Sequence, residues 1–397
     1  MKATLHRVDR VVRFGLQTFG PAAVSVALSW LVIRRHGAVL WGAWVSVTLV
    51  LNLLAHGLSW GNRDDVLRRL SRDGADVQQT VLSHLRGRLL ALLGPAVLAL
   101  LGASVWSGWS LEIVGLGAFW LGLRAICQSA QAPVLHNKTF LSAAMNDVSG
   151  AAVPLMAVWL LGASSVEDLL RFSLLGETLR ALLYLRLLPW WRATTRDATQ
   201  LSAVEVLKSG APFVMLSGVT LIASRIDLYC VALQLSDREV AHYQVMMNLL
   251  LTCASLGGVV ILPFSREIYQ HEATEVYTWV WRTAWISPVI AAVMTAMVTA
   301  VMRVGYQLPM STPMATLAAV YLGALMPHTI AVPTLFRLNR ERLVVWASAG
   351  CAATNLGLNL VLLPRYGLEG ALAASAAVMV GLSLLYGAVL WRAARDT

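Results

Sequence analysis

Long apolar runs separated by short polar connections dominate the chain. Many of the runs are close to 20 residues, the length that a helix needs to cross the hydrocarbon core of a bilayer. They lack the strict apolar–polar alternation that is typical of strands in a membrane barrel. We therefore predict about twelve transmembrane helices, at residues 14–33, 40–60, 89–106, 111–135, 147–163, 169–188, 211–234, 240–262, 283–302, 313–335, 343–363 and 368–391.

The composition supports an all-α integral membrane protein. Of the 397 residues, 57% are hydrophobic and only 13% are charged. A soluble protein usually has about 25% charged residues, so the sequence excludes an ordinary water-soluble fold. The predicted helices and their short connections leave no room for a large soluble domain.

The basic residues predict the orientation of the helices. The formal charge is +10, and 22 of the 31 lysines and arginines fall on the side of the N-terminus, five on the opposite side and four within spans. Short loops rich in Lys and Arg remain in the cytoplasm, so both termini are predicted to be cytoplasmic. Because this topology accounts for most of the charge and the basic residues form no single stripe, no nucleic-acid partner is expected.

Two of the cytoplasmic connections are longer than the others. The first, residues 61–88, mixes apolar residues with charges and is predicted to lie as an amphipathic helix on the membrane surface. The second, residues 189–210, separates six spans from six. We therefore predict two six-helix halves, residues 1–200 and 201–397, an arrangement typical of transporters built from two repeats.

Polar residues within the predicted spans are the candidates for function. In the fourth span, Arg124, Gln128 and Gln131 recur on one face of a helix, and Glu177 and Arg180 lie three residues apart in the sixth. An ionised side chain in hydrocarbon is costly, so it usually faces a partner or a water-filled cavity.

The second half contains a comparable group. Arg225 and Asp227 are two residues apart in the seventh span, and Asn248 belongs to a polar stripe in the eighth. Such side chains also occur as hydrogen-bonding contacts between helices with no role in transport.

We interpret these residues as the wall of a cationic cavity that binds an anionic substrate. Arginine stays charged and can bind phosphate oxygens in a bidentate manner, so Arg124, Arg180 and Arg225 are the predicted contacts. The alternative is that Arg180 pairs with Glu177 and Arg225 with Asp227. These two carboxylates are also candidates for coupling transport to an H⁺ or Na⁺ gradient.

Signatures of enzymes are not found. The sequence has no H-E-x-x-H, P-loop or G-x-S-x-G motif, and its four cysteines show no C-x-x-C spacing. The predicted outer loops are only a few residues long. We therefore predict no catalytic residue, no metal and no cofactor.

Two segments go beyond general hydrophobicity. Residues 225–243 combine an Arg/Asp element with a later "S-x-x-E-V-x-x-Y" pattern, and residues 355–371 follow "N-L-x-L-N-x-x-L-I-P-x-Y-G-x-x-G-A" closely. Both resemble bacterial O-antigen and exopolysaccharide flippases, which belong to the MATE-related multidrug, oligosaccharidyl-lipid and polysaccharide exporters. Residues 34–44 are similar to their first outer loop. In this chain the Arg/Asp element reads Arg225-Ile226-Asp227, which is the reverse of the usual order.

The resemblance implies a MATE-like fold in a bacterial inner membrane. It also implies export of a polyprenyl-diphosphate-linked oligosaccharide, such as a repeat unit of O-antigen, capsule or exopolysaccharide, from the cytoplasmic to the outer leaflet by alternating access. The three arginines would contact the diphosphate, and the polar stripes would contact sugar. Polysaccharide polymerase and glycosyltransferases are then expected partners beside the membrane lipids.

Three other functions compete with this reading. A MATE-like cation-coupled multidrug antiporter would favour acidic residues within the membrane over arginines. Lipid II flippases usually have fourteen spans, more than this chain can form. A membrane-embedded glycan polymerase or ligase would need a large outer loop, which the sequence does not predict.

Overall fold

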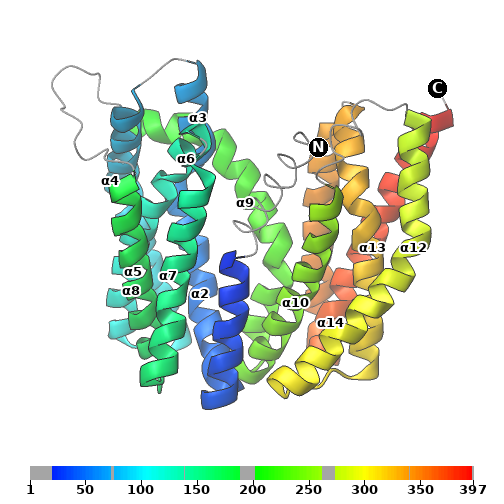
Figure 1. The fold of residues 1–397 in the computed structure, drawn as a ribbon, viewed down its shortest axis with the longest axis horizontal. Coiled ribbons are helices and arrows are strands. Elements are labelled where there is room, and N and C mark those ends of the chain that lie inside the picture. The colour runs from blue at the N-terminus through cyan, green and yellow to red at the C-terminus, as the bar shows by residue number, and fades with distance from the viewer. Residues whose placement is uncertain are drawn as a thin grey trace, which may run out of the picture. The chain divides into compact units, whose positions relative to one another are not determined.

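The computed structural model describes residues 20–72, 76–137, 139–187, 202–261, 273–338 and 340–395. Within these ranges the secondary structure consists of helices (Figure 1). Seven described segments are helical, long and apolar enough to cross a membrane. The chain is therefore a multi-pass helical membrane protein, and the exact number of twelve spans remains a prediction.

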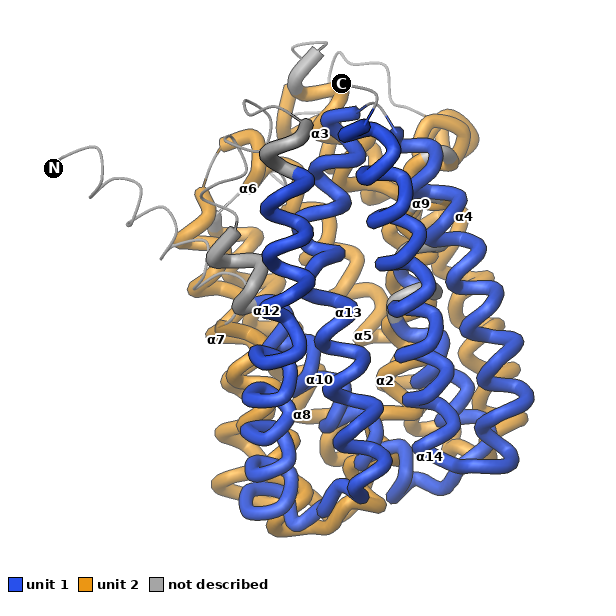
Figure 2. The backbone as a smooth tube through the Cα atoms, turned by 90° about the vertical axis from the view of Figure 1, so that its right-hand side faces the viewer, with its two compact units in different colours: residues 1–11, 220–397 blue, residues 12–219 orange. Residues whose placement is uncertain are grey.

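The described residues form two compact units, one within residues 12–219 and the other within residues 220–397 (Figure 2). The boundary falls inside the long helix α9, Ala203–Gln234. Residues 14–19 of the first predicted span and residues 188–201, most of the second long connection, lie outside the described residues.

The first unit begins with a helix at residues 20–36, followed by seven complete helices and the start of α9. The seven helices are α2 (Ala38–Ser59), α3 (Asn62–Arg72), α4 (Val77–Ser107), α5 (Leu111–Ser129), α6 (Gln131–Asn137), α7 (Phe140–Leu161) and α8 (Val166–Leu187).

The second unit contains the rest of α9 and four longer elements. These are α10 (Asp237–Ile261), α12 (Ala273–Ala300), which continues as a π-helical turn at Val301–Tyr306, α13 (Thr312–Arg337) and α14 (Glu341–Arg395). Within α14, Gly367 has a φ of 55° and a ψ of −136° and divides it into two helices. This break separates the last two predicted spans, 343–363 and 368–391.

Short polar side chains define where several helices begin. Ser110 accepts a hydrogen bond from the backbone N–H of Ile113 at the start of α5, and Ser311 accepts one from Met314 at the start of α13. Such caps satisfy N–H groups that have no partner within the helix. In the first turn of α8, hydrogen bonds from Ser164 lower the pKa of Asp168.

Helix α4 begins earlier than its apolar run predicts. Asp76 accepts a hydrogen bond from the N–H of Gln79, and the helix continues from Val77 without a break into the apolar segment. The prediction of one surface helix over residues 61–88 is therefore wrong for residues 77–88. The separate helix α3 covers Asn62–Arg72, and its Asp65 is buried and accepts a hydrogen bond from Ser209 of α9 at 2.6 Å.

Arg88 shows how α4 can bury a charge. Its side chain is fully buried, and its guanidinium donates to the carbonyls of Leu58 (3.2 Å), Ser59 (3.1 Å) and His84 (3.2 Å). It also donates to the hydroxyl of Ser129 at 2.5 Å. The carbonyls of Leu58 and Ser59 lie at the C-terminal end of α2, where the helix dipole favours a cation.

Two glycines allow α7 and α8 to pack closely. A Cβ on Gly176 would lie 2.3 Å from the carbonyl oxygen of Gly150, and a Cβ on Gly150 would lie 2.9 Å from the Cβ of Arg180. Small residues let membrane helices approach until their backbones touch. This contact holds the segment of α8 that carries Arg180 against α7.

The second resemblance segment forms the end of one helix and the turn into the next. Asn359 is fully buried and donates to Asn355 of the preceding helical turn. After the break at Gly367, Gly370 packs so closely that an added Cβ would lie 2.3 Å from the carbonyl oxygen of Leu362. The pattern therefore reflects a tight helix–helix turn.

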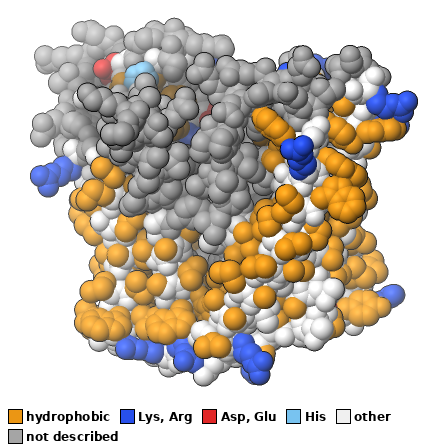
Figure 3. Space-filling view, turned by 45° about the vertical axis from the view of Figure 1, so that its right-hand side comes forward, with side chains coloured by type: hydrophobic (Ala, Val, Ile, Leu, Met, Phe, Trp, Pro, Cys, Tyr) orange, Lys and Arg blue, Asp and Glu red, His pale blue; other side chains and the backbone are white. Residues whose placement is uncertain are grey.

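The exposed surface is apolar, as expected for a protein in contact with the hydrocarbon core of a bilayer. Several large apolar side chains are highly exposed, including Trp106 at 85%, Leu161 at 76% and Trp346 at 76%. On the face shown in Figure 3, hydrophobic side chains cover much of the described surface, and Lys and Arg lie mainly towards its margins. A soluble monomer rarely exposes so much apolar area, so the surrounding lipid explains it.

Candidate functional site

The polar residues predicted in the fourth and sixth spans meet around one small pocket of the first unit. The pocket has a volume of about 190 Å³. It is lined by Pro21, Arg124, Cys127, Gln128, Gln131, Asp147, Arg180 and Tyr184. These residues come from the first described helix and from α5, α6, α7 and α8.

Glu177 of α8 is the centre of the charged network beside this pocket. Its Oε1 atom lies 3.0 Å from Nη1 of Arg124 and 2.7 Å from Nη1 of Arg180. Its Oε2 atom is buried and accepts no hydrogen bond from the described residues. The carboxylate thus binds both guanidiniums through one oxygen and keeps a second, unused acceptor.

The two arginines are held to different extents. Arg180 contacts Glu177, places Nε 3.2 Å from Oδ1 of Asp147, and donates from Nη2 to the Asp147 carbonyl at 3.2 Å. Among the described residues Arg124 forms one ion pair, with Glu177, and its guanidinium lies 5.7 Å from the centre of the Trp120 ring. The Arg124 side chain is also more exposed, at 29% against 12% for Arg180. Arg180 is therefore held by more contacts than Arg124 and is the more buried of the two side chains.

Asp147 and Tyr184 complete the network. The hydroxyl of Tyr184 donates to Oδ1 of Asp147 at 3.0 Å. Asp147 lies two turns inside α7, because α7 begins at Phe140, seven residues before the start of the predicted span. Sequence reasoning missed Asp147 for this reason, since it placed the residue at the end of a helix.

Two amides face the same pocket as the arginines. Gln128 and Gln131 both line it, and Oε1 of Gln128 is buried without a hydrogen bond from the described residues. A buried polar atom of this kind usually has a partner, so it marks a place where a donor can bind. Arg124 and Gln128 lie on α5, whereas Gln131 begins α6 after a break at Ala130, so the predicted single helical face is interrupted although all three residues line the same pocket.

The formal charges at this site balance when all four groups are ionised. Arg124 and Arg180 contribute two positive charges, and Glu177 and Asp147 contribute two negative ones. The arginines are therefore available to an anion only if it replaces a carboxylate, or if a carboxylate takes up a proton. This differs from a cavity with an excess of positive charge, because an anion must exchange with a carboxylate as the partner of an arginine before it can bind.

The predicted group in the second unit has a different arrangement. Two of the three residues predicted here are in contact, because Arg225 donates to Oδ1 of Asn248 at 3.1 Å. Asp227 is buried and does not pair with Arg225 in the described residues. It accepts hydrogen bonds from the hydroxyls of Tyr243 (2.7 Å) and Ser375 (3.0 Å) and from the N–H of Leu228 (2.8 Å).

The first resemblance segment thus has a structural explanation too. Ser236 donates through its N–H and its hydroxyl to the carboxylate of Glu239 as α10 begins. One turn beyond Glu239, Tyr243 reaches back to Asp227 of α9. The serine, glutamate and tyrosine of the pattern fix the α9–α10 turn, and only Tyr243 contacts a predicted site residue.

Comparison with known proteins places this arrangement in a known fold. No model of a protein family and no curated protein sequence matches the chain. Solved structures do match: the inward closed conformation of the lipid II flippase MurJ has a TM-score of 0.67 at 14% sequence identity, over 95% of this chain and 87% of that one.

Multidrug transporters share the same architecture. An inward-facing multidrug resistance MATE family transporter of the MOP superfamily matches with a TM-score of 0.59 at 14% identity, covering 98% of this chain and 99% of that chain. A MOP superfamily transporter from Pyrococcus furiosus, noted for the reverse polarity of its binding pocket, matches with a TM-score of 0.52 at 14% identity, over 98% and 95% of the two chains. The MATE-like fold predicted from the sequence is confirmed, and the function must be argued from the site.

Proposed function

We propose that this chain is a flippase that moves a polyprenyl-diphosphate-linked oligosaccharide from the cytoplasmic to the outer leaflet by alternating access. The observation that carries the proposal is the ion pair of Arg124 with Glu177 beside a pocket that is lined in part by the amides of Gln128 and Gln131. In this view the membrane is the bacterial inner membrane, with both termini in the cytoplasm. The twelve spans form two six-helix halves, and polysaccharide polymerase and glycosyltransferases act before or after transport.

The chemistry of Arg124 suits a phosphate. A phosphate group that enters the pocket can replace Glu177 as the acceptor for Arg124, because an arginine binds phosphate oxygens at least as well as it binds a carboxylate. Glu177 then remains neutralised by Arg180, which lies 2.7 Å away. Because the phosphate adds negative charge to a site whose four charges already balance, one of the two carboxylates must take up a proton to keep the low-dielectric interior neutral, where an isolated ion is costly.

The size of the pocket limits what it can bind. A volume of about 190 Å³ is smaller than the roughly 300–1,000 Å³ typical of sites that enclose a whole small-molecule ligand. It can therefore receive the phosphates and the first polar groups next to them. Gln128 and Gln131 then supply amide donors and acceptors for sugar hydroxyls.

The same network suggests how an ion gradient can drive transport. Protonation of Glu177 would release Arg124 and leave Arg180 paired with Asp147. Asp227 already accepts three hydrogen bonds, so it has less to gain from a proton. Of the two carboxylates singled out in the sequence, we therefore assign ion coupling to Glu177. Arg225 and Asn248 provide a further guanidinium and amide in the second unit.

A MATE-like cation-coupled multidrug antiporter is the second candidate. The observation that favours it is the presence of two carboxylates, Glu177 and Asp147, beside the same pocket. An organic cation could replace Arg124 as the partner of Glu177. The two functions make opposite demands on the site, because the flippase needs Arg124 and the antiporter needs the carboxylates free of it.

The proposal is tested in cells that depend on this chain for surface polysaccharide. Arg124→Ala, and separately Arg225→Ala, should abolish the polysaccharide while the protein still reaches the membrane. Arg34→Ala is the matched control, because Arg34 is an exposed arginine at the end of the first described helix. Normal polysaccharide with both Arg124→Ala and Arg225→Ala would refute the flippase. Increased resistance to cationic drugs in Arg124→Ala, lost again when Glu177→Gln is added, would establish the antiporter.

A further inference from the structure

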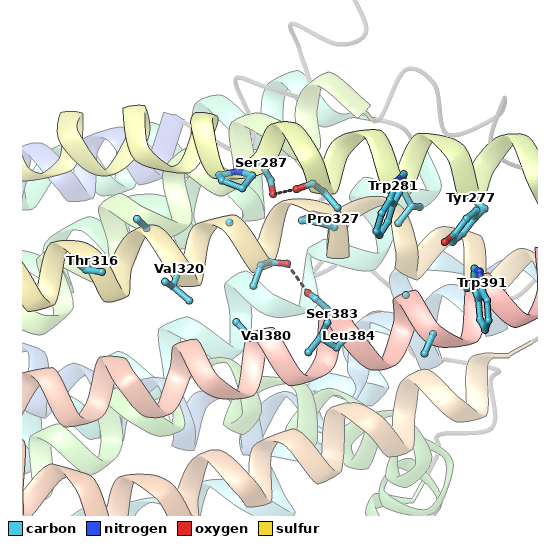
Figure 4. Close-up of a pocket in the computed structure, with 18 residues that line it drawn as sticks. Tyr277, Trp281, Ser287, Thr316, Val320, Pro327, Val380, Ser383, Leu384 and Trp391 are labelled. Atoms are coloured by element: carbon cyan, nitrogen blue, oxygen red, sulfur yellow. Dashed lines mark hydrogen bonds between the residues drawn. The ribbon is translucent and has the colours of Figure 1, made fainter.

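A long apolar groove belongs to the second unit, whereas the charged pocket belongs to the first. It has a volume of about 740 Å³ and is bordered by α12, α13 and α14. Figure 4 shows Tyr277, Trp281 and Trp391 gathered at one end, with Thr316 and Val320 towards the other.

The lining of the groove is mainly apolar. The two serines of the lining already donate hydrogen bonds to backbone carbonyls. Ser287 donates to Ala284 of its own helix, α12, at 2.9 Å, and Ser383 of α14 donates to Ala324 of α13 at 2.6 Å (Figure 4). Gly323, Gly387 and several alanines leave the space in which side chains would otherwise pack. A hydrocarbon chain is the ligand that matches such a wall.

The groove is open along its side. Trp281 is 54% exposed, Leu384 69% and Val320 45%. Along α14 the lining extends from Val380 to Trp391, about 17 Å at the rise of a helix. This distance covers one leaflet of a hydrocarbon core that is roughly 30 Å thick. A chain lying in the groove would therefore reach from the membrane surface to the middle of the bilayer.

The aromatic end of the groove is positively charged. The guanidinium of Arg395 lies over the ring of Trp391, 4.9 Å from its centre. Arg282 and Arg392 are exposed and follow directly after Trp281 and Trp391 in the sequence. None of these three arginines has an ion pair among the described side chains. Tryptophan and arginine at a helix end are typical of the level at which lipid headgroups lie.

We propose that this groove binds one anionic phospholipid of the bilayer. One hydrocarbon chain lies between α12, α13 and α14, and the phosphate contacts Arg392 and Arg395 at the aromatic end. A bulk phospholipid fits better than a scarce biosynthetic lipid, because a laterally open site fills by mass action from the surrounding membrane. This site is separate from the substrate pocket, and it stands whether or not the flippase proposal does.

The test uses the purified full-length protein and native mass spectrometry. The protein is mixed with phosphatidylglycerol or phosphatidylcholine, and retained lipid is counted. The wild type should retain one phosphatidylglycerol in preference to phosphatidylcholine. Arg392→Gln with Arg395→Gln should weaken that binding about 25-fold, since each arginine near a lipid surface contributes about a fivefold effect.

A second pair of variants tests the groove itself. Gly387 lines it, and a Cβ built there meets nothing within 4 Å, so Gly387→Leu should fill the groove without a clash in the protein. Gly381 on the same helix is equally free of neighbours and does not line the groove, so Gly381→Leu is the matched control. Gly387→Leu should lose the lipid, and Gly381→Leu should keep it.

Three results would overturn the proposal. Equal retention of the two phospholipids, with no effect of the arginine variants, would remove the headgroup site. Full retention by Gly387→Leu would remove the groove as the chain site. Displacement of phosphatidylglycerol by equimolar polyprenyl phosphate would identify the carrier lipid, and not a bulk phospholipid, as the occupant.

Discussion

The different anchoring of Arg124 and Arg180 predicts a large difference in stability between their variants. Arg180→Met leaves Asp147 without an ion pair among the described residues, while Glu177 keeps its ion pair with Arg124 at 3.0 Å. Arg124→Met removes one contact, and Glu177 stays paired with Arg180 at 2.7 Å. The two substitutions delete the same group from the same network, so each serves as the control for the other.

The expected loss of stability in each variant follows from how deeply its arginine is buried. Breaking a buried ion pair by removing one partner costs about 3–5 kcal/mol. The side chain of Arg180 is 12% exposed, so its replacement belongs to this class. Arg124 is 29% exposed, and without it both carboxylates still contact Arg180, so its replacement should cost about 1 kcal/mol or less. In a unit of this size, 1 kcal/mol shifts the melting temperature by about 2–4 °C.

The assay heats the detergent-solubilised, fluorescently tagged protein and measures the monodisperse fraction by size-exclusion chromatography. Arg180→Met should lower the apparent melting temperature by about 6–20 °C and Arg124→Met by about 4 °C or less. Adding Asp147→Asn to Arg180→Met should recover part of the loss, because it removes the carboxylate that has lost its partner. Equal melting temperatures for the two arginine variants would refute the reasoning.

Two further predictions concern packing and pH. Gly176→Ala should lower the melting temperature and the yield of folded protein, because its Cβ would lie 2.3 Å from a carbonyl oxygen of α7; Gly122→Ala, where a Cβ meets nothing within 4 Å, should be neutral, and equal effects would contradict the close approach. Because hydrogen bonds from Ser164 lower the pKa of Asp168, its stabilising contribution is present above the unfolded pKa, near 4, and is lost as the pH falls through the folded value. Thermal scans from pH 6 to pH 3 should show a smaller acid loss for Asp168→Asn than for the wild type, and identical curves would contradict this role.

The helices could be predicted from the sequence because burial in lipid leaves a direct pattern. A run of apolar residues near 20 long must satisfy its backbone within itself, and a helix does this. Helix ends were less predictable. Asp76 caps α4 thirteen residues before the apolar run that we assigned from residue 89, so a polar segment became part of the same helix. Fully buried Arg88 is compatible with that helix because its donors reach three carbonyls and a hydroxyl.

The site could be predicted only in part. The spacing of Arg124 and Gln128 places them on one face of α5, and Gln131, which begins α6, lines the same pocket. The partner of Arg124 was not predictable, because Glu177 is 53 residues away and no local pattern links the two. Asp227 is the opposite case. Its neighbour Arg225 suggested a local pair, whereas the packed helices supply Tyr243 and Ser375 as donors.

The most direct test of the flippase proposal is transbilayer movement in proteoliposomes. Purified protein is reconstituted with a fluorescent polyprenyl-diphosphate-linked glycan, and the fraction that becomes accessible to a membrane-impermeant quencher is followed over time. The wild type and Arg34→Ala should move the lipid well above the protein-free rate, and Arg124→Ala should fall to that rate. Movement by Arg124→Ala at the wild-type rate, or none by the wild type, would contradict the role that we assign to the exchange of Glu177 for phosphate.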